Sequence, residues 1–278
     1  MIEFYFSKNF KGQGISEGIE RGILVDYNSK CIVQEGMGLG APAIKTNNRT
    51  FFSCNSELIK VSDKEYFKEF NINSELVWEI FKARSEKYKS VNLLTIFINK
   101  LTDLYKRLRV IQPILLKLGI LTRDFFQTNS KINHIDSLGK IKFFYTILKD
   151  GALIEVDFSQ ILKRNGGVIS KICIMNELGG EFFNYSKFGE KILAPPSGWE
   201  KIKGDTYKKL YSDKFNLEFD VKLLEYPHKC KIDFIVGREK LSNFCWAGFD
   251  IEININSDLL ISNLNNGKVK YICRLKAP

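Results

Sequence analysis

The chain has 278 residues, of which 44% are hydrophobic, 13% aromatic and 27% charged. This composition is typical of a folded globular protein and excludes a disordered chain. Its formal net charge is +10, from 42 basic and 32 acidic residues, which permits contact with an anionic partner without requiring one. The uncharged stretches are too short to span a bilayer, and the N-terminal sequence MIEFYFSKNFK lacks the apolar run of a signal peptide. We therefore expect a soluble, cytoplasmic protein that does not contact a membrane.

The first 60 residues predict short strands. Ile2–Phe6, Gly22–Tyr27, Cys31–Gln34 and Thr50–Cys54 are rich in β-branched and aromatic residues, and the intervening Asn28-Ser29-Lys30 predicts a hairpin turn. These strands suggest that the N-terminal part belongs to a β-domain.

A glycine-rich segment, GMGLGAP, lies between the third and fourth of these predicted strands and is too rich in glycine for regular structure. Its spacing approaches a dinucleotide-binding fingerprint, but the next predicted strand follows too soon for the helix that such a site requires. We interpret the segment as a loop that either connects strands or lines a ligand site, because glycine allows a bound molecule to approach the backbone. Gly36, Gly38, Gly40 and the nearby Arg49 are therefore candidate ligand contacts.

Residues 61–128 predict helices. Ser62 and Glu65 have the spacing of a capping box, and Asn73 or Ser74 is a suitable start for a second helix. A third helix is predicted from apolar residues that alternate at spacings of three and four: Leu94, Phe97, Leu101, Leu104, Leu108, Ile111, Leu115 and Leu118. This seam either pairs two chains or packs within one chain, and we favour the second arrangement and a monomer. The segment 94–123 is also strongly basic, which makes it a candidate interface for nucleic acid or a partner protein.

From residue 129 onward the apolar period returns to two. Asp150-Gly151 predicts a tight hairpin, and the alternation over 215–223 and at Ile251, Ile253 and Ile255 predicts strands with one wet face. Asn266-Gly267 predicts a further turn. The sequence thus predicts an α+β fold, in which residues 1–60 and 129–278 form an antiparallel β-sandwich and residues 61–128 form a helical insertion or subdomain.

Metal and cofactor chemistry has no support in the sequence. The six cysteines form no CxxC pair, and with two histidines the chain cannot build a histidine-rich metal site. We expect buried free thiols, no metal and no cofactor.

Two other residue types are candidates for a site. Glu177 and Glu181 flank a predicted turn and are candidate catalytic carboxylates, although carboxylates at turns are usually only solvated. Trp199 and Trp246 are candidate ligand contacts because an exposed tryptophan can stack on a sugar ring, although each also suits a sandwich core.

The leading hypothesis from these features is a protein that binds a small molecule or carbohydrate on a β-sandwich. The first alternative is a carbohydrate-active enzyme, a hydrolase or lyase, that uses paired carboxylates. The second is an interaction module for nucleic acid or protein that uses the basic helix at 94–123, and we do not favour nucleic acid as the partner. Whether the protein is an enzyme stays open at this point, because no nucleophile motif is present.

Overall fold

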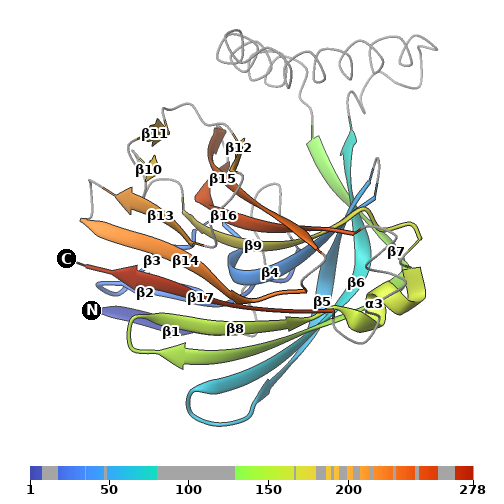
Figure 1. Cartoon of the computed structure of the whole chain (residues 1–278), viewed down its shortest axis with the longest axis horizontal. Coiled ribbons are helices and arrows are strands. Elements are labelled where there is room, and N and C mark those ends of the chain that lie inside the picture. The colour runs from blue at the N-terminus through green and yellow to red at the C-terminus, as the bar shows by residue number, and fades with distance from the viewer. Residues whose placement is uncertain are drawn as a thin grey trace, which may run out of the picture. The chain divides into compact units, whose positions relative to one another are not determined.

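The computed structural model (Figure 1) describes residues 1–7, 18–34, 36–46, 49–79, 129–165, 167–179, 186–188, 191–193, 199–202, 207–212, 216–227, 230–241, 244–255 and 267–277. The chain divides into two compact units. One consists of Met1–Leu76 with Ile132–Pro278, and the other of Val77–Lys131. Nearly all of the described residues belong to the first unit.

One antiparallel sheet of 12 strands dominates this unit, and Figure 1 shows that it curls strongly. The strands lie side by side in the order β12-β15-β16-β9-β4-β5-β6-β7-β8-β17-β14-β13. In chain order they are β4 (Gly38–Lys45), β5 (Thr50–Lys60), β6 (Glu65–Glu79), β7 (Asn129–Leu148), β8 (Gly151–Asp157), β9 (Lys171–Gly179), β12 (Trp199–Ile202), β13 (Tyr207–Ser212), β14 (Leu217–Glu225), β15 (Lys231–Leu241), β16 (Phe244–Asn254) and β17 (Lys268–Lys276). Strands from both ends of the chain therefore share one sheet.

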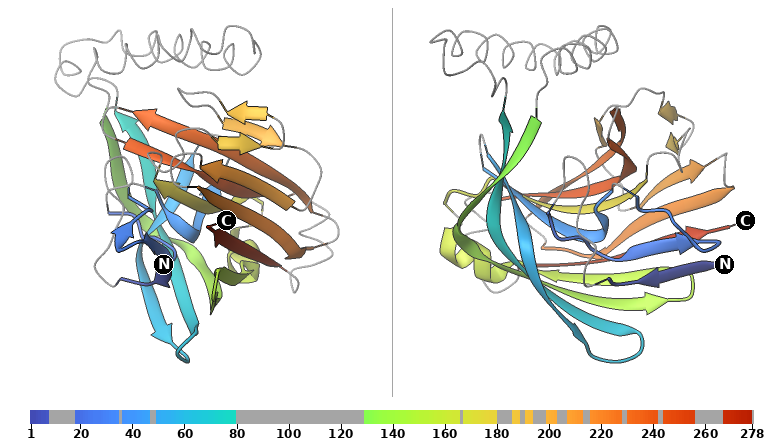
Figure 2. Two further views of the ribbon diagram at one scale, coloured as in Figure 1. Left: turned by 90° about the vertical axis from the view of Figure 1, so that its left-hand side faces the viewer. Right: turned by 180° about the vertical axis from the view of Figure 1, so that it is seen from behind.

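Smaller elements complete the unit. They are the three-stranded sheet of β1 (Ile2–Tyr5), β2 (Leu24–Tyr27) and β3 (Lys30–Cys31), the pair β10 (Ser186–Phe188) and β11 (Lys191–Leu193), and the helix α3 (Ser159–Asn165). The three-stranded sheet packs on one face of the large sheet, because Val25 and Ile32 are fully buried in the same core as Phe143 and Tyr271. We call that face of the large sheet its inner face and the opposite face its outer face. Figure 2 shows the small sheet and the large sheet from two further sides.

The N-terminal segment also fills a gap in the large sheet. β4 and β5 pair only at Ile44–Phe51 and Lys45–Thr50, and beyond these pairs they separate. Residues 20–23 lie between them. The Glu20 N–H donates to the carbonyl of Ser53 at 2.7 Å, and Ile23 exchanges two backbone hydrogen bonds with Leu39, at 2.8 and 3.0 Å. The segment thereby satisfies backbone groups that the separation of the two strands would leave without partners.

The predicted α+β fold is wrong. The described residues form strands almost throughout, with α3 as their one helix, and a single curled sheet replaces the two facing sheets of a sandwich. The predicted helix start at Ser62 is the turn of a hairpin between β5 and β6. The Glu65 N–H donates to Ser62 Oγ at 3.1 Å, as in a capping box, but the chain continues as a strand. Asn73 and Ser74 lie inside β6.

Several local predictions are confirmed. The hairpin predicted at Asp150-Gly151 joins β7 to β8, although its turn residues are Lys149 and Asp150 and Gly151 already pairs with Leu148. The turn between β2 and β3 has positive φ at Asn28 (51°) and Ser29 (63°). The strands predicted at 2–6, 22–27 and 50–54 correspond to β1, β2 and β5. The predicted helix at 94–118, the basic segment at 94–123 and Asn266 lie outside the described residues.

Candidate functional site

The outer face carries a group of charged side chains where β4, β9, β16 and β15 pair. Alternate residues of a strand face the same side of the sheet, so the register decides which side chains meet. Lys45 of β4 lies opposite Lys171 of β9, and Glu252 of β16 lies opposite both Cys173 of β9 and Asp233 of β15. Residues far apart in the sequence therefore meet on adjacent strands. We call Lys45, Lys171, Cys173, Asp233, Asp250 and Glu252 the outer-face cluster.

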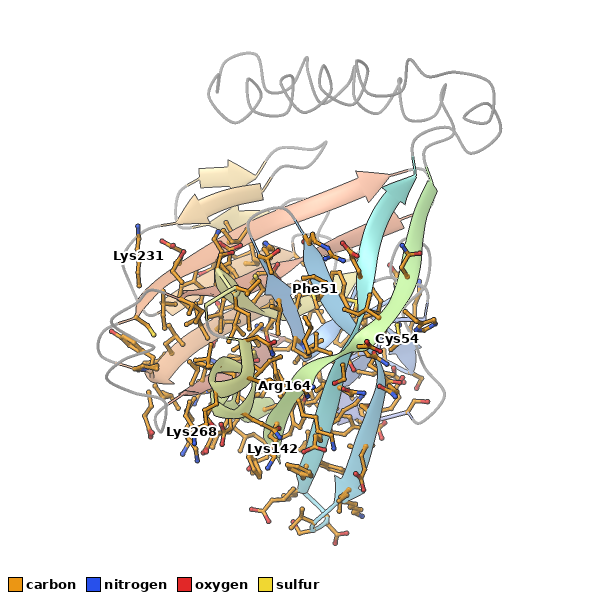
Figure 3. All side chains as sticks on the ribbon, turned by 90° about the vertical axis from the view of Figure 1, so that its right-hand side faces the viewer. Phe51, Cys54, Lys142, Arg164, Lys231 and Lys268 are labelled. Carbon is orange, nitrogen blue, oxygen red and sulfur yellow. The ribbon has the colours of Figure 1, made fainter. Side chains whose placement is uncertain are left out.

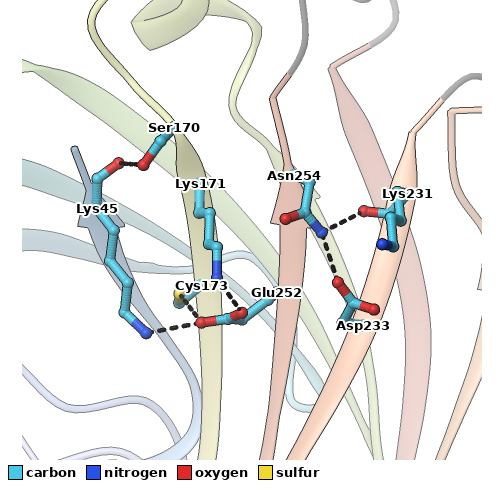
Figure 4. Close-up of polar contacts among 8 residues, drawn as sticks. All are labelled: Lys45, Ser170, Lys171, Cys173, Lys231, Asp233, Glu252 and Asn254. Carbon is cyan, nitrogen blue, oxygen red and sulfur yellow. Dashed lines mark hydrogen bonds and ion pairs between the residues drawn. The ribbon is translucent and has the colours of Figure 1, made fainter. Parts of the chain in front are cut away.

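Glu252 is the centre of this cluster. Figure 4 shows Lys45 and Lys171 converging on its carboxylate, with Lys45 Nζ 2.7 Å from Oε1 and Lys171 Nζ 2.7 Å from Oε2. The Glu252 side chain is only 4% exposed, whereas the side chains of Lys45 and Lys171 are 38% and 32% exposed. One buried carboxylate thus anchors two lysines whose side chains stay about one-third exposed.

Neighbouring contacts hold the cluster in place. The Cys173 thiol lies 3.7 Å from Glu252 Oε1. Asn254, two residues after Glu252 on β16, bonds to the neighbouring strand β15. Its Nδ2 donates to Asp233 Oδ2 at 2.8 Å and to the carbonyl of Lys231 at 2.9 Å (Figure 4). Because these contacts lie on paired strands, the backbone ladder fixes the positions from which the charged groups project.

Asp250 lies two residues before Glu252 on the same face of β16. Burial raises the pKa of its carboxyl to about 7, an effect that Lys45 opposes and the negative charge of Glu252 reinforces. Burial also acts to raise the pKa of Glu252, but Lys45 and Lys171 outweigh it and hold that pKa below its ordinary value. The two carboxyls therefore differ in charge near neutral pH, with Glu252 ionised and Asp250 near its titration midpoint.

The electrostatics also limit what chemistry the cluster can perform. Burial raises the pKa of the Cys173 thiol to about 12, so it carries no thiolate at neutral pH. Burial acts to lower the pKa of Lys45, but Cys173 and Glu252 outweigh it and raise that pKa above its ordinary value. Neither group is an activated nucleophile. The arrangement suits electrostatic binding, with Asp250 as the group that exchanges a proton near pH 7.

An apolar cluster borders the charged one on the same face. It consists of Ile19, Met37, Ala41, Ala43, Cys173 and Met175, with Phe52 and Ile132 packed against it. The charged residues thus have an apolar wall on one side, which lowers the local dielectric and strengthens their interactions.

The predicted glycine site lies within the protein. Gly38 and Gly40 belong to β4, with φ of +74° and +76°, and Gly36 immediately precedes that strand. The carbonyl of Gly40 accepts a hydrogen bond from the Tyr145 hydroxyl at 2.7 Å, and its N–H donates to Asn176 Oδ1 at 3.1 Å. The interpretation of this segment as a loop is wrong, because Gly38–Lys45 is a buried strand. Ligand contact by these glycines stays a prediction.

The other predicted site residues lie in three places. Arg49 is exposed, forms two hydrogen bonds to the Glu75 carboxylate and lies over the Phe51 ring at 5.0 Å. Glu177 is buried in β9 and accepts a hydrogen bond from the Met37 N–H at 3.1 Å. Glu181 is outside the described residues.

Both candidate tryptophans lie on strands near the cluster. The backbone of Trp199 in β12 pairs with Gly237 of β15, and the backbone of Trp246 in β16 pairs with Glu239 of β15. Together with Glu177 on β9 and the glycines of β4, they occupy the block β12-β15-β16-β9-β4 that carries the outer-face cluster. A ligand contact by either tryptophan stays a prediction.

On the outer face of β7, β8 and β17, the described lysines lie opposite carboxylates. Lys142 of β7 and Lys268 of β17 both lie opposite Asp157 of β8, and Figure 3 shows the two lysines projecting from the sheet. Lys268 Nζ is also 3.2 Å from Glu155. Such exposed, alternating pairs give no basic patch, in contrast to the two lysines that share Glu252.

Other kinds of site have no support in the described part of the chain. It contains no group of three or more His, Cys, Asp or Glu side chains placed to hold a metal ion. Cys54, Cys173, Cys230 and Cys273 are buried thiols, and Cys31 is a half-buried thiol. No helix in the described ranges has the length and apolarity needed to cross a membrane.

Comparisons with models of protein families, with curated proteins and with solved structures find no match for this chain. The function is therefore argued from the geometry and electrostatics of the outer-face cluster.

Proposed function

We propose that the protein binds a small anionic molecule, such as a sugar acid, at Lys45 and Lys171 on the outer face of β4 and β9. The observation that carries this proposal is that two lysines share one buried carboxylate while about a third of each lysine side chain stays exposed. Glu252, the carboxylate in direct contact with both lysines, balances only one of the two positive charges. Each ammonium group has three N–H donors, so donors remain for a ligand carboxylate or phosphate.

The expected affinity is modest. A hydrogen bond to a charged group contributes about 1.5–3 kcal/mol, and two such bonds must also offset the cost of immobilising the ligand. We therefore expect a dissociation constant of roughly 0.1–10 mM for the anionic group alone. Further contacts with the hydroxyl groups of a sugar would tighten it.

Calorimetric titration with glucuronate tests the proposal, with glucose as the neutral control ligand. We expect binding of glucuronate that weakens as salt is added, and no binding of glucose. Lys45→Met and Lys171→Met should each weaken glucuronate binding about tenfold or more, because each removes one charge-assisted contact. Lys268→Met is the matched control, since Lys268 pairs with Glu155 elsewhere on the outer face and should not affect binding.

A second set of variants separates binding from folding. Lys45→Met leaves Glu252 with one partner, so Lys45→Met/Glu252→Gln removes the charge pair together and limits the loss of stability. Equal glucuronate affinity in the wild type and in folded Lys45→Met protein would contradict the proposed site.

An acid–base enzyme is the second candidate, and one observation favours it. Asp250 and Glu252 lie two residues apart on one strand, and their pKa values shift in opposite directions. In glycosidases such a pair lets one carboxyl donate a proton while the other stays ionised. We rank this function second because both carboxyls are buried and Glu252 is already engaged by two lysines.

A chromogenic aryl glucuronide distinguishes the two functions. We expect binding without release of the aryl alcohol. Release that is lost in Asp250→Asn protein would instead favour the enzyme. A role for the basic segment 94–123 in binding a partner, and a cytoplasmic location, stay predictions.

A further inference from the structure

Asp250 lies two residues before Glu252, the carboxylate that the two lysines share. Its side chain lies opposite Met175 of β9 and Ile235 of β15, and the residue is 8% exposed. A backbone hydrogen bond from Asn176 to the carboxyl acts to lower its pKa, but within the described part of the chain the Oδ1 atom has no hydrogen-bond partner. A buried carboxyl oxygen without a partner is costly when ionised, which is a reason for the group to hold a proton.

Charged and titratable groups reach the face around Asp250 from each strand packed beside it. They are Lys45 on β4, Lys171, Cys173 and Glu177 on β9, Glu252 on β16 and Asp233 on β15. Lys45 and Glu252 act on Asp250 with opposite sign, since Lys45 favours its ionised form and Glu252 its neutral form. The charge on Asp250 therefore interacts with Lys45, one of the two ammonium groups that would bind an anion.

We propose that anion binding at Lys45 and Lys171 is coupled to the uptake of a proton by Asp250. This inference rests on the proposed anion site. When Asp250 is ionised, its negative charge attracts Lys45 and repels an incoming anion, so both effects weaken binding. When Asp250 is neutral, the charge of Lys45 is available to the ligand. By linkage, an anion that binds the neutral form more tightly must raise the proton affinity of Asp250.

The direction of the pH dependence follows from this coupling. Burial places the pKa of the free Asp250 carboxyl at about 7, so the group changes charge in the physiological range. Affinity for an anion should be highest below this value and should fall as the pH rises through it. If the bound anion raises the pKa by about one unit, the affinity falls about tenfold across the transition.

The experiment is calorimetric titration of the full chain with glucuronate, whose own carboxyl stays ionised throughout, at pH 6, 7 and 8. At pH 7 the titration is repeated in two cationic buffers of different ionisation enthalpy, which reports the number of protons taken up. For the wild type we expect about fivefold weaker binding at pH 8 than at pH 6, since the transition is only partly complete over this range, with net proton uptake at pH 7.

Two variants assign the effect to Asp250. Asp250→Asn keeps the shape of the side chain and mimics its neutral form, so it should bind glucuronate at pH 8 as tightly as the wild type does at pH 6, without proton uptake. Asp63→Asn, on an exposed turn, should retain the pH dependence of the wild type. Circular dichroism confirms that each variant is folded before titration.

The possible failures are distinguishable. Wild-type binding that is independent of pH, or an unchanged pH dependence in Asp250→Asn, overturns the proton coupling and leaves the anion site standing. Absence of glucuronate binding at every pH overturns both the anion site and the coupling.

Discussion

Gly22 lies so close to Leu39 that a Cβ atom at position 22 would sit 2.0 Å from the Leu39 carbonyl oxygen. The approach is reciprocal, because a Cβ atom at Gly38, where φ is +74°, would sit 2.4 Å from the carbonyl oxygen of Ile23. Two backbones therefore pack against each other without side chains between them. This contact fixes the N-terminal segment beside β4. It explains why positions 22 and 38 are glycine without any contact to a ligand.

Gly22→Ala should destabilise the protein by about 3 kcal/mol or more. The added methyl group meets a backbone carbonyl that belongs to a paired strand, so the clash can be relieved only by moving the backbone. Urea-induced unfolding measures the loss. Gly167→Ala is the control, since a Cβ atom there meets nothing within 4 Å, and its stability should stay within about 0.5 kcal/mol of the wild type. A similar small effect at both positions would contradict the close packing of residues 22 and 39.

Lys68→Met should cost about 3–5 kcal/mol, because Lys68 is a buried cation. Its Nζ atom donates to the carbonyl of Arg21 at 2.6 Å and lies 3.2 Å from Glu20 Oε2, with a side chain only 7% exposed. Removing the ammonium group takes the opposite charge away from the largely buried Glu20 carboxylate and a donor away from the Arg21 carbonyl. Lys140→Met is the matched control, since Lys140 pairs with Glu69 at an exposed site and should cost at most about 1 kcal/mol. Chemical denaturation of the two variants compares them directly, and equal losses would contradict this account.

The same lysine shows why part of the fold could not be predicted from the sequence. In β6 the buried positions alternate as Lys68, Phe70, Ile72 and Ser74, which is a regular period of two. Two of these four residues are polar, so the pattern of apolar residues alone does not show the period. The capping-box spacing of Ser62 and Glu65 also favours a helix at this position, but the same local hydrogen bond forms in a hairpin turn. The hairpin between β7 and β8 could be predicted because Asp150 and Gly151 favour a turn between two apolar runs, although the turn itself lies one residue earlier, at Lys149 and Asp150.

The candidate site could not be predicted from the sequence for a related reason. The alternation of Ile251, Ile253 and Ile255 identifies a strand and implies that the residues between them face water. Asp250 and Glu252 occupy that face but are buried, because β4, β9 and β15 pack around them. Lys45 and Lys171 reach them from parts of the chain with no local link to β16. Only the strand order, a property of the whole chain, brings these residues together.

The cysteines should react in an order set by burial. The thiol pKa values of Cys173 and Cys230 are raised to about 12 and about 11 by burial, and burial also raises the pKa of Cys273 well above its ordinary value. Because the thiolate is the reactive form, alkylation of Cys173 at pH 8 should be slower than that of an ordinary thiol by roughly three orders of magnitude. Mass spectrometry after treatment of the native protein with iodoacetamide should find Cys31 modified before these three. The same treatment in urea should modify all of them, and rapid native modification of Cys173 would contradict its burial.

The stability of the protein should depend on pH through Asp250. The pKa of this carboxyl is about 7 in the folded protein and close to 4 in an unfolded chain. Between these values the folded state holds a proton that the unfolded state has released, so the contribution of Asp250 to stability falls as the pH rises from about 4 to about 7 and is constant above that.

Asp250→Asn abolishes this contribution. The free energy of unfolding of the variant, compared with that of the wild type, should therefore be about 2–3 kcal/mol more favourable at pH 8 than at pH 5. This figure is about 1.36 kcal/mol per pH unit over the two units from pH 5 to pH 7. Urea unfolding of both proteins at the two pH values measures the difference. The effect of Glu252 cancels in this difference, because its pKa is lowered and it is ionised in both proteins at both pH values. An equal difference at pH 5 and pH 8 would show that Asp250 does not carry a raised pKa.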